Sequence, residues 1–495
     1  MVTVKKESLS NQIEPFIYDR LEKIEYEIKT IDSCELLTWN RFDLAFKLIY
    51  LDSIDSYPKL AKETYKYDIK AQTLGSFKEL GNEGNKNKFE HYIDQFSYTY
   101  NEIKDNGFLK EKTLIPLSTD GTIINGAHRV ASAIHLDKPV SCVVTEQSTM
   151  VANYEYFIDR DIPVKHLDSV AKKFIEYSND NIYMAFLWPS GNGDKKAVEN
   201  IFSNIVYKKA ITLTPKGSFN LLYELYNHMD WIGTTKNGFS GIKQKLVECF
   251  PSFESFQVIL FQSESLEKVQ ELKQKVRDIH NIGYSSIHIT DTKEEVIQIS
   301  DFIFNDNGLH FINNAEINKY IQLKNKLDEF KSFLYKNKIE KKDVVIDGSS
   351  TLSLYGLREN IDIDFLTLDN SKIVFPNIEF DTHDSELQYH QKSKEELIYD
   401  SSNYYIYDGL KFISFSQLYK MKSNRNEEKD RNDCLMMKSL LEGNLYKKSK
   451  AQIKQKLFYF KIKSRRKFMD LSMSFFKTVG VYKLVRSIYR KLKAS

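Results

Sequence analysis

Apolar and polar positions alternate differently in successive parts of the chain. Residues 10–110 have apolar residues at helical spacing and predict mainly helices. Residues 111–147 predict a compact unit of strand, Asp-Gly turn, strand, helix and strand. From about 150 to 320, buried strands alternate with amphipathic helices, which is α/β patterning. The strands are predicted in "IYMAFLWP", "AITLT", "FQVILFQ" and "SIHIT", and two helices in "SLEKVQELKQKVRDIH" and "KEEVIQISDFIF".

The last part of the chain predicts a third unit and a tail. A helix predicted from Glu316 to Asn337 leads into the short strand "DVVI", and the pattern of this unit ends near Glu442. We therefore expect a multidomain protein of mixed α/β and α+β class. Its expected parts are an N-terminal domain with a helical extension (1–150), a central α/β domain (151–320), a C-terminal domain (321–446) and a basic helical tail (447–495).

The stretch "IDGSSTLSLYGLRENIDIDFLTL", residues 346–368, contains two aspartates separated by one isoleucine. Alternate side chains of a strand lie on opposite faces, so Asp362 and Asp364 are expected to share one face. Neighbouring carboxylates repel each other, which favours a cation between them. Upstream, the Gly348-Ser349-Ser350 turn opens a short helix, whose free N–H groups favour an anion. The stretch therefore predicts a phosphate group and Mg²⁺ side by side.

In order and spacing, these motifs resemble the nucleotidyltransferase superfamily, which includes DNA polymerase beta and the aminoglycoside nucleotidyltransferases. The family signature is an apolar strand, Gly-Gly/Ser, roughly a dozen residues and then Asp-x-Asp/Glu in a second strand. The resemblance covers about 100 of the 495 residues and implies that Gly348, Ser349 and Ser350 bind a nucleoside triphosphate. It also implies that Asp362 and Asp364 are catalytic and bind Mg²⁺, which neutralises charge in an in-line displacement at the α-phosphate.

A third acid and several cations are usual in this family. "NIEFDTH" offers Glu379 and Asp381 on one strand face, and we prefer Asp381 as the third catalytic acid. The resemblance further implies the phosphate ligands Arg358, Lys422 and Lys429 and the orienting residues Asp430 and Asp433. Each motif alone is common in ordinary turns, strands and helices, whereas their correct order favours a function.

A second motif lies in the N-terminal part, where "DGTIINGAHRVASAIHL" resembles the ParB/sulfiredoxin fold. Members of that fold share a strand followed by Gly-x-His-Arg, or a close variant, at the start of a helix that holds nucleotide phosphates. The resemblance implies nucleotide binding by Asn125, Gly126, His128 and Arg129. An arginine fork at a helix start is well suited to a phosphate group.

The chemistry of this N-terminal unit stays open. Ala127 stands near the position of the reactive cysteine of sulfiredoxin, and a DNA-binding helix-turn-helix is not evident downstream. A kinase-like phosphotransfer unit is left, with Glu79 or Asp120 as its catalytic acid. The structural alternative is that His128 and Arg129 cap a helix and pair with an acid.

Charge is distributed unevenly along the chain. The net charge is +3, but residues 447–495 contain sixteen Lys/Arg and one acid, which leaves −12 for residues 1–446. An acidic body argues against a large nucleic-acid-binding surface there. The tail has apolar residues at helical spacing between its cations, namely Val481, Leu484, Val485, Ile488 and Leu492. This pattern favours an amphipathic helix on an anionic membrane, with RNA binding or docking on the acidic body as alternatives.

Cysteine usage and hydropathy indicate the compartment. Four scattered cysteines favour a reducing environment, and no signal-peptide core or membrane-spanning run is evident. We expect a cytoplasmic protein, peripheral at the inner face of the membrane. The leading hypothesis is Mg²⁺-dependent transfer of a nucleotidyl or phosphoryl group to a small-molecule acceptor, coupled to an N-terminal kinase-like module, in bacterial surface-glycan (capsule polysaccharide) biosynthesis. The alternatives are a toxin or regulator that nucleotidylates tRNA or protein, and a non-catalytic nucleotide-binding protein.

Overall fold

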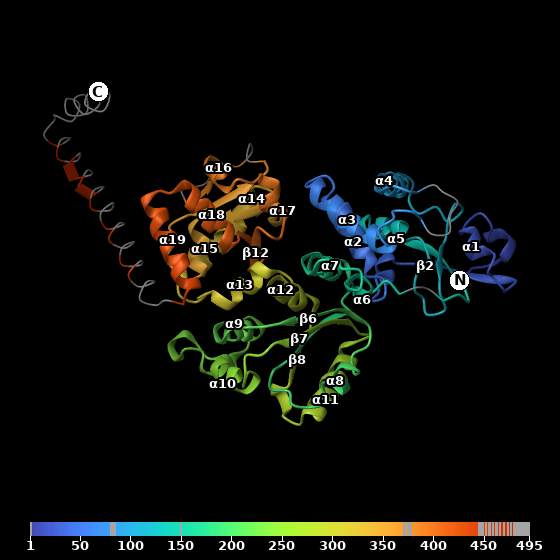
Figure 1. Cartoon of the computed structure of the whole chain (residues 1–495), viewed down its shortest axis with the longest axis horizontal. Helices are drawn as coiled ribbons and strands as arrows, with labels where there is room; N and C mark the ends of the chain where they lie inside the picture. Colours follow the sequence, from blue (N-terminus) through green and yellow to red (C-terminus); the bar gives the residue numbers. More distant parts are fainter. Residues whose placement is uncertain are drawn as a thin grey trace.

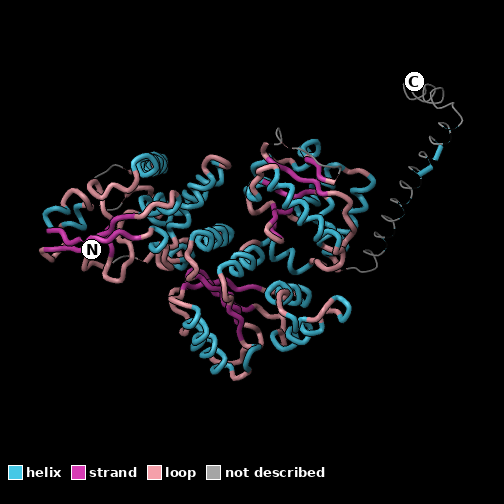
Figure 2. Tube along the Cα trace, turned by 180° about the vertical axis from the view of Figure 1, so that it is seen from behind, coloured by secondary structure: helices cyan, strands magenta, loops and turns pink. Residues whose placement is uncertain are grey.

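The computed structural model describes residues 2–79, 86–148, 151–369, 373 and 379–443, together with single positions between 450 and 478. Within these ranges, helices and strands form three units that follow one another along the chain (Figure 1). Each unit is built on its own sheet, and Figure 2 shows the three groups of strands separated by helices. The predicted mixed α/β, multidomain class is therefore confirmed.

The N-terminal unit has a sheet of order β1-β2-β4-β3, in which only β3 and β4 are parallel. Its strands are β1 (Val2–Lys5), β2 (Glu25–Ile31), β3 (Ile115–Leu117) and β4 (Val140–Val144). Its helices are α1 (Pro15–Tyr18), α2 (Asp43–Ser53), α3 (Pro58–Gln72), α4 (Phe89–Asn106) and α5 (Ala127–His135), followed by α6 (Tyr154–Ile158) and α7 (Val164–Tyr177). Because α7 packs on α2, the N-terminal core extends beyond the boundary expected at residue 150.

The central unit has a sheet of order β6-β7-β5-β8, and all of its strand pairs are antiparallel. Its strands are β5 (Ile182–Leu187), β6 (Ile205–Ile211), β7 (Phe256–Gln262) and β8 (Ile287–Ile289). Its helices are α8 (Lys195–Glu199), α9 (Pro215–Tyr226), α10 (Ser240–Cys249), α11 (Leu266–His280), α12 (Lys293–Ile303) and α13 (Asp306–Asn314). Since β7 lies between β5 and β6, this is a split β-α-β arrangement. The strand predicted in "AITLT" begins earlier, at Ile205.

The C-terminal unit has a sheet of order β11-β10-β9-β13-β12. Its strands are β9 (Val344–Asp347), β10 (Ile363–Thr367), β11 (Phe380–Thr382), β12 (Tyr404–Tyr407) and β13 (Leu410–Ile413). Its helices are α14 (Gln322–Lys336), α15 (Ser349–Leu354), α16 (Leu387–His390), α17 (Lys394–Tyr399), α18 (Phe415–Arg425) and α19 (Glu428–Leu441). The rings of Phe330 and Phe333 on α14 pack against Phe365 of β10, which anchors this strand in the core. The helix predicted from Glu316 begins at Gln322.

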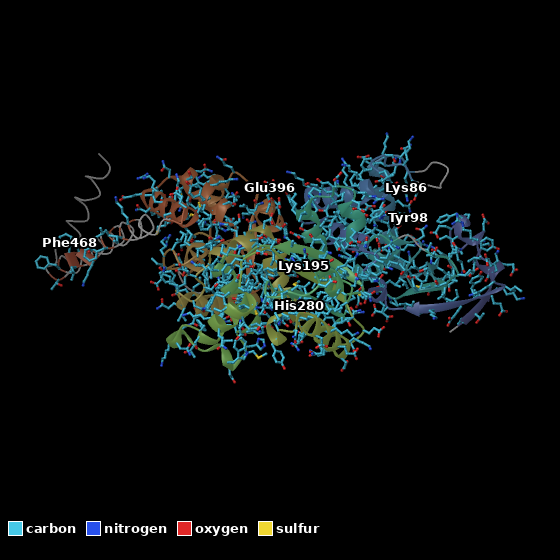
Figure 3. All side chains as sticks on the ribbon, turned by 60° about the horizontal axis from the view of Figure 1, so that its bottom comes forward. Lys86, Tyr98, Lys195, His280, Glu396 and Phe468 are labelled. Atoms are coloured by element: carbon cyan, nitrogen blue, oxygen red, sulfur yellow. The ribbon has the colours of Figure 1, made fainter. Side chains whose placement is uncertain are left out.

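The three units contact one another. Lys59 of α3 forms an ion pair of 3.5 Å with Glu396, which Figure 3 labels where the C-terminal unit meets the N-terminal unit. The side-chain amide of Asn305, at the start of α13, donates to the carbonyl oxygens of Ser401 and Tyr404. Among the described helices, none has the length and apolar character needed to cross a membrane.

Candidate functional site

The glycine turn and the aspartate pair lie side by side in the C-terminal unit. β9 ends at Asp347, Gly348 follows with a φ of 69°, and α15 begins at Ser349. A Cβ atom added to Gly348 would lie 2.6 Å from Oδ2 of Asp364. Only glycine accepts this backbone conformation and allows the turn to approach the carboxylate so closely. The predicted juxtaposition of turn and acid is therefore present.

Strand register places three aspartates in a row. Asp364 of β10 pairs with Asp347 of the antiparallel β9 and with Asp381 of the parallel β11. Residues directly opposite each other in a sheet share a face. Asp381 is exposed, so the third predicted acid lies at the solvent end of this row.

The two predicted metal ligands interact electrostatically. Burial, joined by the nearby carboxylates of Asp362 and Asp347, raises the pKa of Asp364 to about 6, against the opposing effect of His383. Ile363 is fully buried on the opposite face, as the alternation predicts. Ile361 does not continue this buried face: it is 64% exposed, because β10 begins only at Ile363.

Two histidines hold Asp347, an arrangement that the sequence analysis missed. His383 Nδ1 lies 2.7 Å and His390 Nε2 lies 2.8 Å from the same carboxylate oxygen. Burial would raise the pKa of Asp347, but the two imidazoles outweigh it and lower it well below the ordinary value. In return, the hydrogen bond to Asp347 raises the pKa of His383 against the opposing effect of burial. The position of Asp347 directly before the glycine turn was the available signal.

The predicted phosphate ligands form a chain of alternating charges. Arg358 binds Asp433 through two hydrogen bonds of 2.8 and 3.0 Å, and Lys422 lies 2.9 Å from the same carboxylate. Lys422 also lies 3.3 Å from Asp430, which Arg425 holds through two bonds of 2.8 Å. Burial would raise the pKa of both aspartates, but their cations outweigh it and lower it. Asp430 and Asp433 thus orient Lys422, as the resemblance implies.

Lys422 also joins this chain to the acidic row. Its charge is close enough to Asp364 to lower the pKa of that carboxyl, against the effect of burial. Lys429 is not brought to the same place. It is 40% exposed and pairs with Glu427 at 3.2 Å, because the left-handed Asn426 ends α18 and redirects the chain. Ser350 is fully buried, so its side chain is structural.

Mg²⁺ prefers hard oxygen donors in a near-octahedral arrangement. In the described part of the chain, no three His, Cys, Asp or Glu side chains form a group able to hold a metal ion. Mg²⁺ commonly takes only one or two carboxylates and completes its coordination with water and substrate phosphates. Asp362 and Asp364 supply hard oxygen donors, and the raised pKa of Asp364 reflects burial and neighbouring carboxylates, whose cost to the ionised form a cation would offset. The pair therefore fits Mg²⁺ that binds together with a nucleotide.

The "NGAHR" motif begins α5 as predicted, with Gly126 in the left-handed region at a φ of 99°. The ring of His128 packs 4.7 Å from that of Phe96, and Tyr65 Oη lies 2.7 Å from His128 Nε2. Burial lowers the pKa of His128 well below its ordinary value, and the ammonium group of Lys47 lowers it further. His128 is therefore a neutral, enclosed ring. Asn125 accepts the N–H of Gly126 at 2.6 Å.

Arg129 is already paired with an acid. Its Nη2 lies 2.6 Å from Glu14, and its Nη1 donates to the Thr113 hydroxyl. Glu79 pairs with Lys86 at 3.0 Å, and Lys86 is close enough to His128 to lower the pKa of that ring. The pairing of Arg129 with Glu14 is what the structural alternative predicts, in which His128 and Arg129 cap a helix and pair with an acid.

The second acid proposed for the N-terminal unit belongs to a turn. Asp120 accepts the hydroxyl of Ser118 and, at 3.1 Å, the N–H of Thr122. These bonds lower the pKa of Asp120, the Ser118 bond most. Asp120 thus stabilises the predicted Asp-Gly turn.

A buried charge network beside this motif was not predicted. Lys47 of α2 lies 3.1 Å from Asp43 and 2.7 Å from Asp68, and Arg41 forms two bonds of 2.8 Å with Asp43. The i, i+4 spacing of Asp43 and Lys47 within the apolar "RFDLAFKLIYL" was the available signal. Such a network is held by mutual pairing, since leaving one member alone in the core is strongly unfavourable.

Comparison with known proteins adds no family to this description. No family model, no curated protein and no solved structure matches the chain. Both motif resemblances therefore stay predictions, supported only by the residues and geometry of this chain.

Proposed function

We propose that the C-terminal unit transfers a nucleotidyl group from a nucleoside triphosphate to a small-molecule acceptor, with Mg²⁺. The observation that carries this proposal is the approach of Gly348 to Asp364 beside Lys422. Two stretches close in sequence thereby supply a close-approach turn and a carboxylate pair, and a third, much further along the chain, supplies an oriented cation. Phosphoryl-transfer sites need these parts, because their catalysis is mainly positioning and charge neutralisation.

In this proposal each side chain has a defined task. Asp362 and Asp364 hold Mg²⁺, which when bound neutralises charge on the phosphates. Lys422, held in place by two buried aspartates, contacts the triphosphate near the glycine turn. Asp381 accepts the proton of the acceptor hydroxyl, whose oxygen forms a bond to the α-phosphorus while pyrophosphate leaves. Its exposed position gives an acceptor access.

The tail is proposed to bring this unit to an anionic membrane surface. Phe468, which Figure 3 labels, is one of six described apolar tail side chains that are each more than half exposed. The others are Ile453, Leu457, Phe460, Leu471 and Phe475. Exposed apolar side chains among lysines and arginines are typical of segments that bind the headgroup region. The stripe predicted from Val481 to Leu492 lies outside the described residues.

The test is a turnover screen with the full chain. Purified protein is mixed with each of the four NTPs, Mg²⁺ and pooled small metabolites, and pyrophosphate release is followed. Asp362→Asn and Asp364→Asn should abolish release, whereas Asp328→Asn on the exposed face of α14 should not change it. Transfer of an α-phosphate label to tRNA or protein instead of a metabolite would contradict the small-molecule acceptor. Full activity of both site variants would overturn the assignment of the site.

A further inference from the structure

A pocket lies in the central unit, outside the site described above. It has a volume of about 520 Å³ and is lined by residues of α9, α10, α11 and β8 and of the short helix η3 (Asp230–Ile232). This volume is typical of small-molecule sites, which span about 300–1,000 Å³. The elements α9, η3 and α10 lie between β6 and β7 in the chain and form one side of this open pocket, and α11 and β8 contribute to the other.

Two cations of this pocket are positioned without an acid. The Arg277 guanidinium lies 4.5 Å from the ring centroid of Tyr284, and its Nε is buried without a hydrogen-bond partner. Lys245 donates to the backbone carbonyl of Tyr284 at 2.9 Å. Within the part of the chain that the structure describes, neither side chain forms an ion pair with a carboxylate, whereas the neighbouring Lys273 lies 3.3 Å from Asp291. Glu248, Asp291 and Glu295 also line the pocket, but none of them pairs with Arg277 or Lys245, so these two cations are the groups placed for an anionic ligand.

An aromatic surface stands in the same pocket. Tyr226 Oη lies 3.0 Å from Nδ1 of His288, whose Nε2 lies 3.1 Å from Glu295. This series of hydrogen bonds fixes the ring of Tyr226. The centroid of that ring lies 5.2 Å from the centroid of the Trp231 indole. Trp231 is nevertheless 46% exposed, which is unusual for so large an apolar side chain in a pocket wall. An exposed indole that packs on a fixed tyrosine ring offers a flat surface on which a ligand ring can stack.

We propose that this pocket binds a phosphorylated small molecule, with its phosphate on Arg277 and Lys245 and its ring on Trp231. A guanidinium fork matches the oxygens of a phosphate group, and a charge-assisted bond of this kind is stronger than a neutral one. Sugar phosphates and nucleotides share this chemistry. The inference is independent of nucleotidyl transfer, since it concerns binding in another unit of the chain.

Binding to the full-length protein tests the proposal. The probes are inorganic phosphate, glucose 1-phosphate, AMP and unphosphorylated glucose, measured by calorimetry and by tryptophan fluorescence. Of the three tryptophans, Trp188 is buried and Trp39 is partly buried, so Trp231 should report a stacked ring. We expect a phosphorylated probe to bind and quench fluorescence, and glucose not to bind. A stronger response to glucose 1-phosphate or to AMP identifies the ring as a sugar or a nucleobase.

Matched variants locate the bound probe. Arg277→Ala should weaken binding at least tenfold, and Arg277→Lys less, because it keeps the charge without the fork. Lys275→Ala removes a charge from the exposed side of the same helix and should leave binding unchanged. Trp231→Ala should weaken the ring-bearing probe severalfold but not inorganic phosphate. The proposal is wrong if the folded Arg277→Ala protein binds every probe like the wild type. It is also wrong if no phosphorylated probe binds the wild type. AMP that binds at the C-terminal site instead would still bind the Arg277→Ala variant.

Discussion

Replacing Asp364 with asparagine should stabilise the C-terminal unit at neutral pH while abolishing nucleotide turnover. Asp364 has a folded-state pKa of about 6, whereas its ordinary value is 3.8. The folded protein therefore resists ionisation of this carboxyl, which the unfolded chain accepts freely. Asparagine keeps the shape of the side chain without the charge. It removes the repulsion from Asp362 and the penalty of burying a carboxylate.

The magnitude follows from the separation between the two pKa values. At about 1.4 kcal/mol per pH unit, the separation corresponds to about 3 kcal/mol when Asp364 is fully ionised. Solvent screening at a partly exposed group reduces this value, so we expect about 1–3 kcal/mol at pH 8. Below pH 4 the carboxyl is protonated in both states, and the difference between variant and wild type should vanish. The gain develops as the pH rises from about 4 through 6.

Thermal unfolding of the full-length proteins between pH 4 and 8 measures this difference. For a domain of this size, 1 kcal/mol shifts the midpoint by roughly 2–4 °C, so the gain is readily detected. Asp381→Asn is the matched control, because it makes the same change at an exposed position opposite in register. Mg²⁺ with a nucleotide should raise the midpoint of the wild type but not that of Asp364→Asn, since binding stabilises only a protein that retains its ligands.

Two outcomes would refute this reasoning. A variant that is less stable than the wild type at pH 8 would show that Asp364 makes favourable contacts as a carboxylate. A stability difference that does not change between pH 4 and 8 would show that its ionisation is not involved. Loss of turnover without a stability gain would keep the catalytic assignment and remove the electrostatic explanation.

Three further predictions concern other parts of the chain. Asp433→Asn should destabilise the C-terminal unit by about 3–5 kcal/mol in urea denaturation, because it leaves the charge of Lys422 incompletely paired in the core; no change would show that Asp430 suffices. If Arg129 is a phosphate ligand restrained by its ion pair with Glu14, Glu14→Gln should strengthen nucleotide binding in calorimetry and Arg129→Ala should weaken it. Equal binding by both variants would leave the "NGAHR" motif with a structural role only. Truncation after Gln455 should preserve turnover and remove binding to anionic vesicles. High salt should release the intact protein from these vesicles only partly, because apolar contacts are not screened. Equally weak binding of the intact protein to neutral and anionic vesicles would contradict the membrane role of the tail.

The local parts of the fold could be predicted because their signals are local. The helix predicted in "SLEKVQELKQKVRDIH" is α11 within one residue, and the glycine turn between β9 and α15 follows from four adjacent residues. The topology of the central sheet could not be predicted in this way. An apolar run indicates that a segment is a buried strand. Which strand it pairs with depends on long-range packing, which the sequence of a single strand does not encode.

The same limit applies to the candidate site. The proximity of Gly348 to Asp364 follows from a hairpin-like spacing and was predictable, whereas His390 reaches Asp347 across 43 residues. Lys429 was misplaced because spacing alone placed it beside Lys422. The left-handed residue Asn426 turns the chain between α18 and α19 and places Lys422 and Lys429 on different helices.

Charge compensation ranks the three ligand-binding proposals. In the N-terminal unit, Arg129 already has a carboxylate at 2.6 Å, so a phosphate must displace Glu14 before it gains anything. In the C-terminal unit, burial and two neighbouring carboxylates disfavour the ionised form of Asp364, so a cation that binds there stabilises a carboxylate that His383 and Lys422 compensate only in part. In the central pocket, the buried Nε of Arg277 lacks a hydrogen-bond partner, and a ligand would satisfy it. Polar groups left incomplete inside a folded protein are unfavourable unless a ligand completes them. The C-terminal and central sites are therefore the ones where binding should be detected first, and nucleotide binding by the N-terminal unit should depend on the loss of one competing carboxylate.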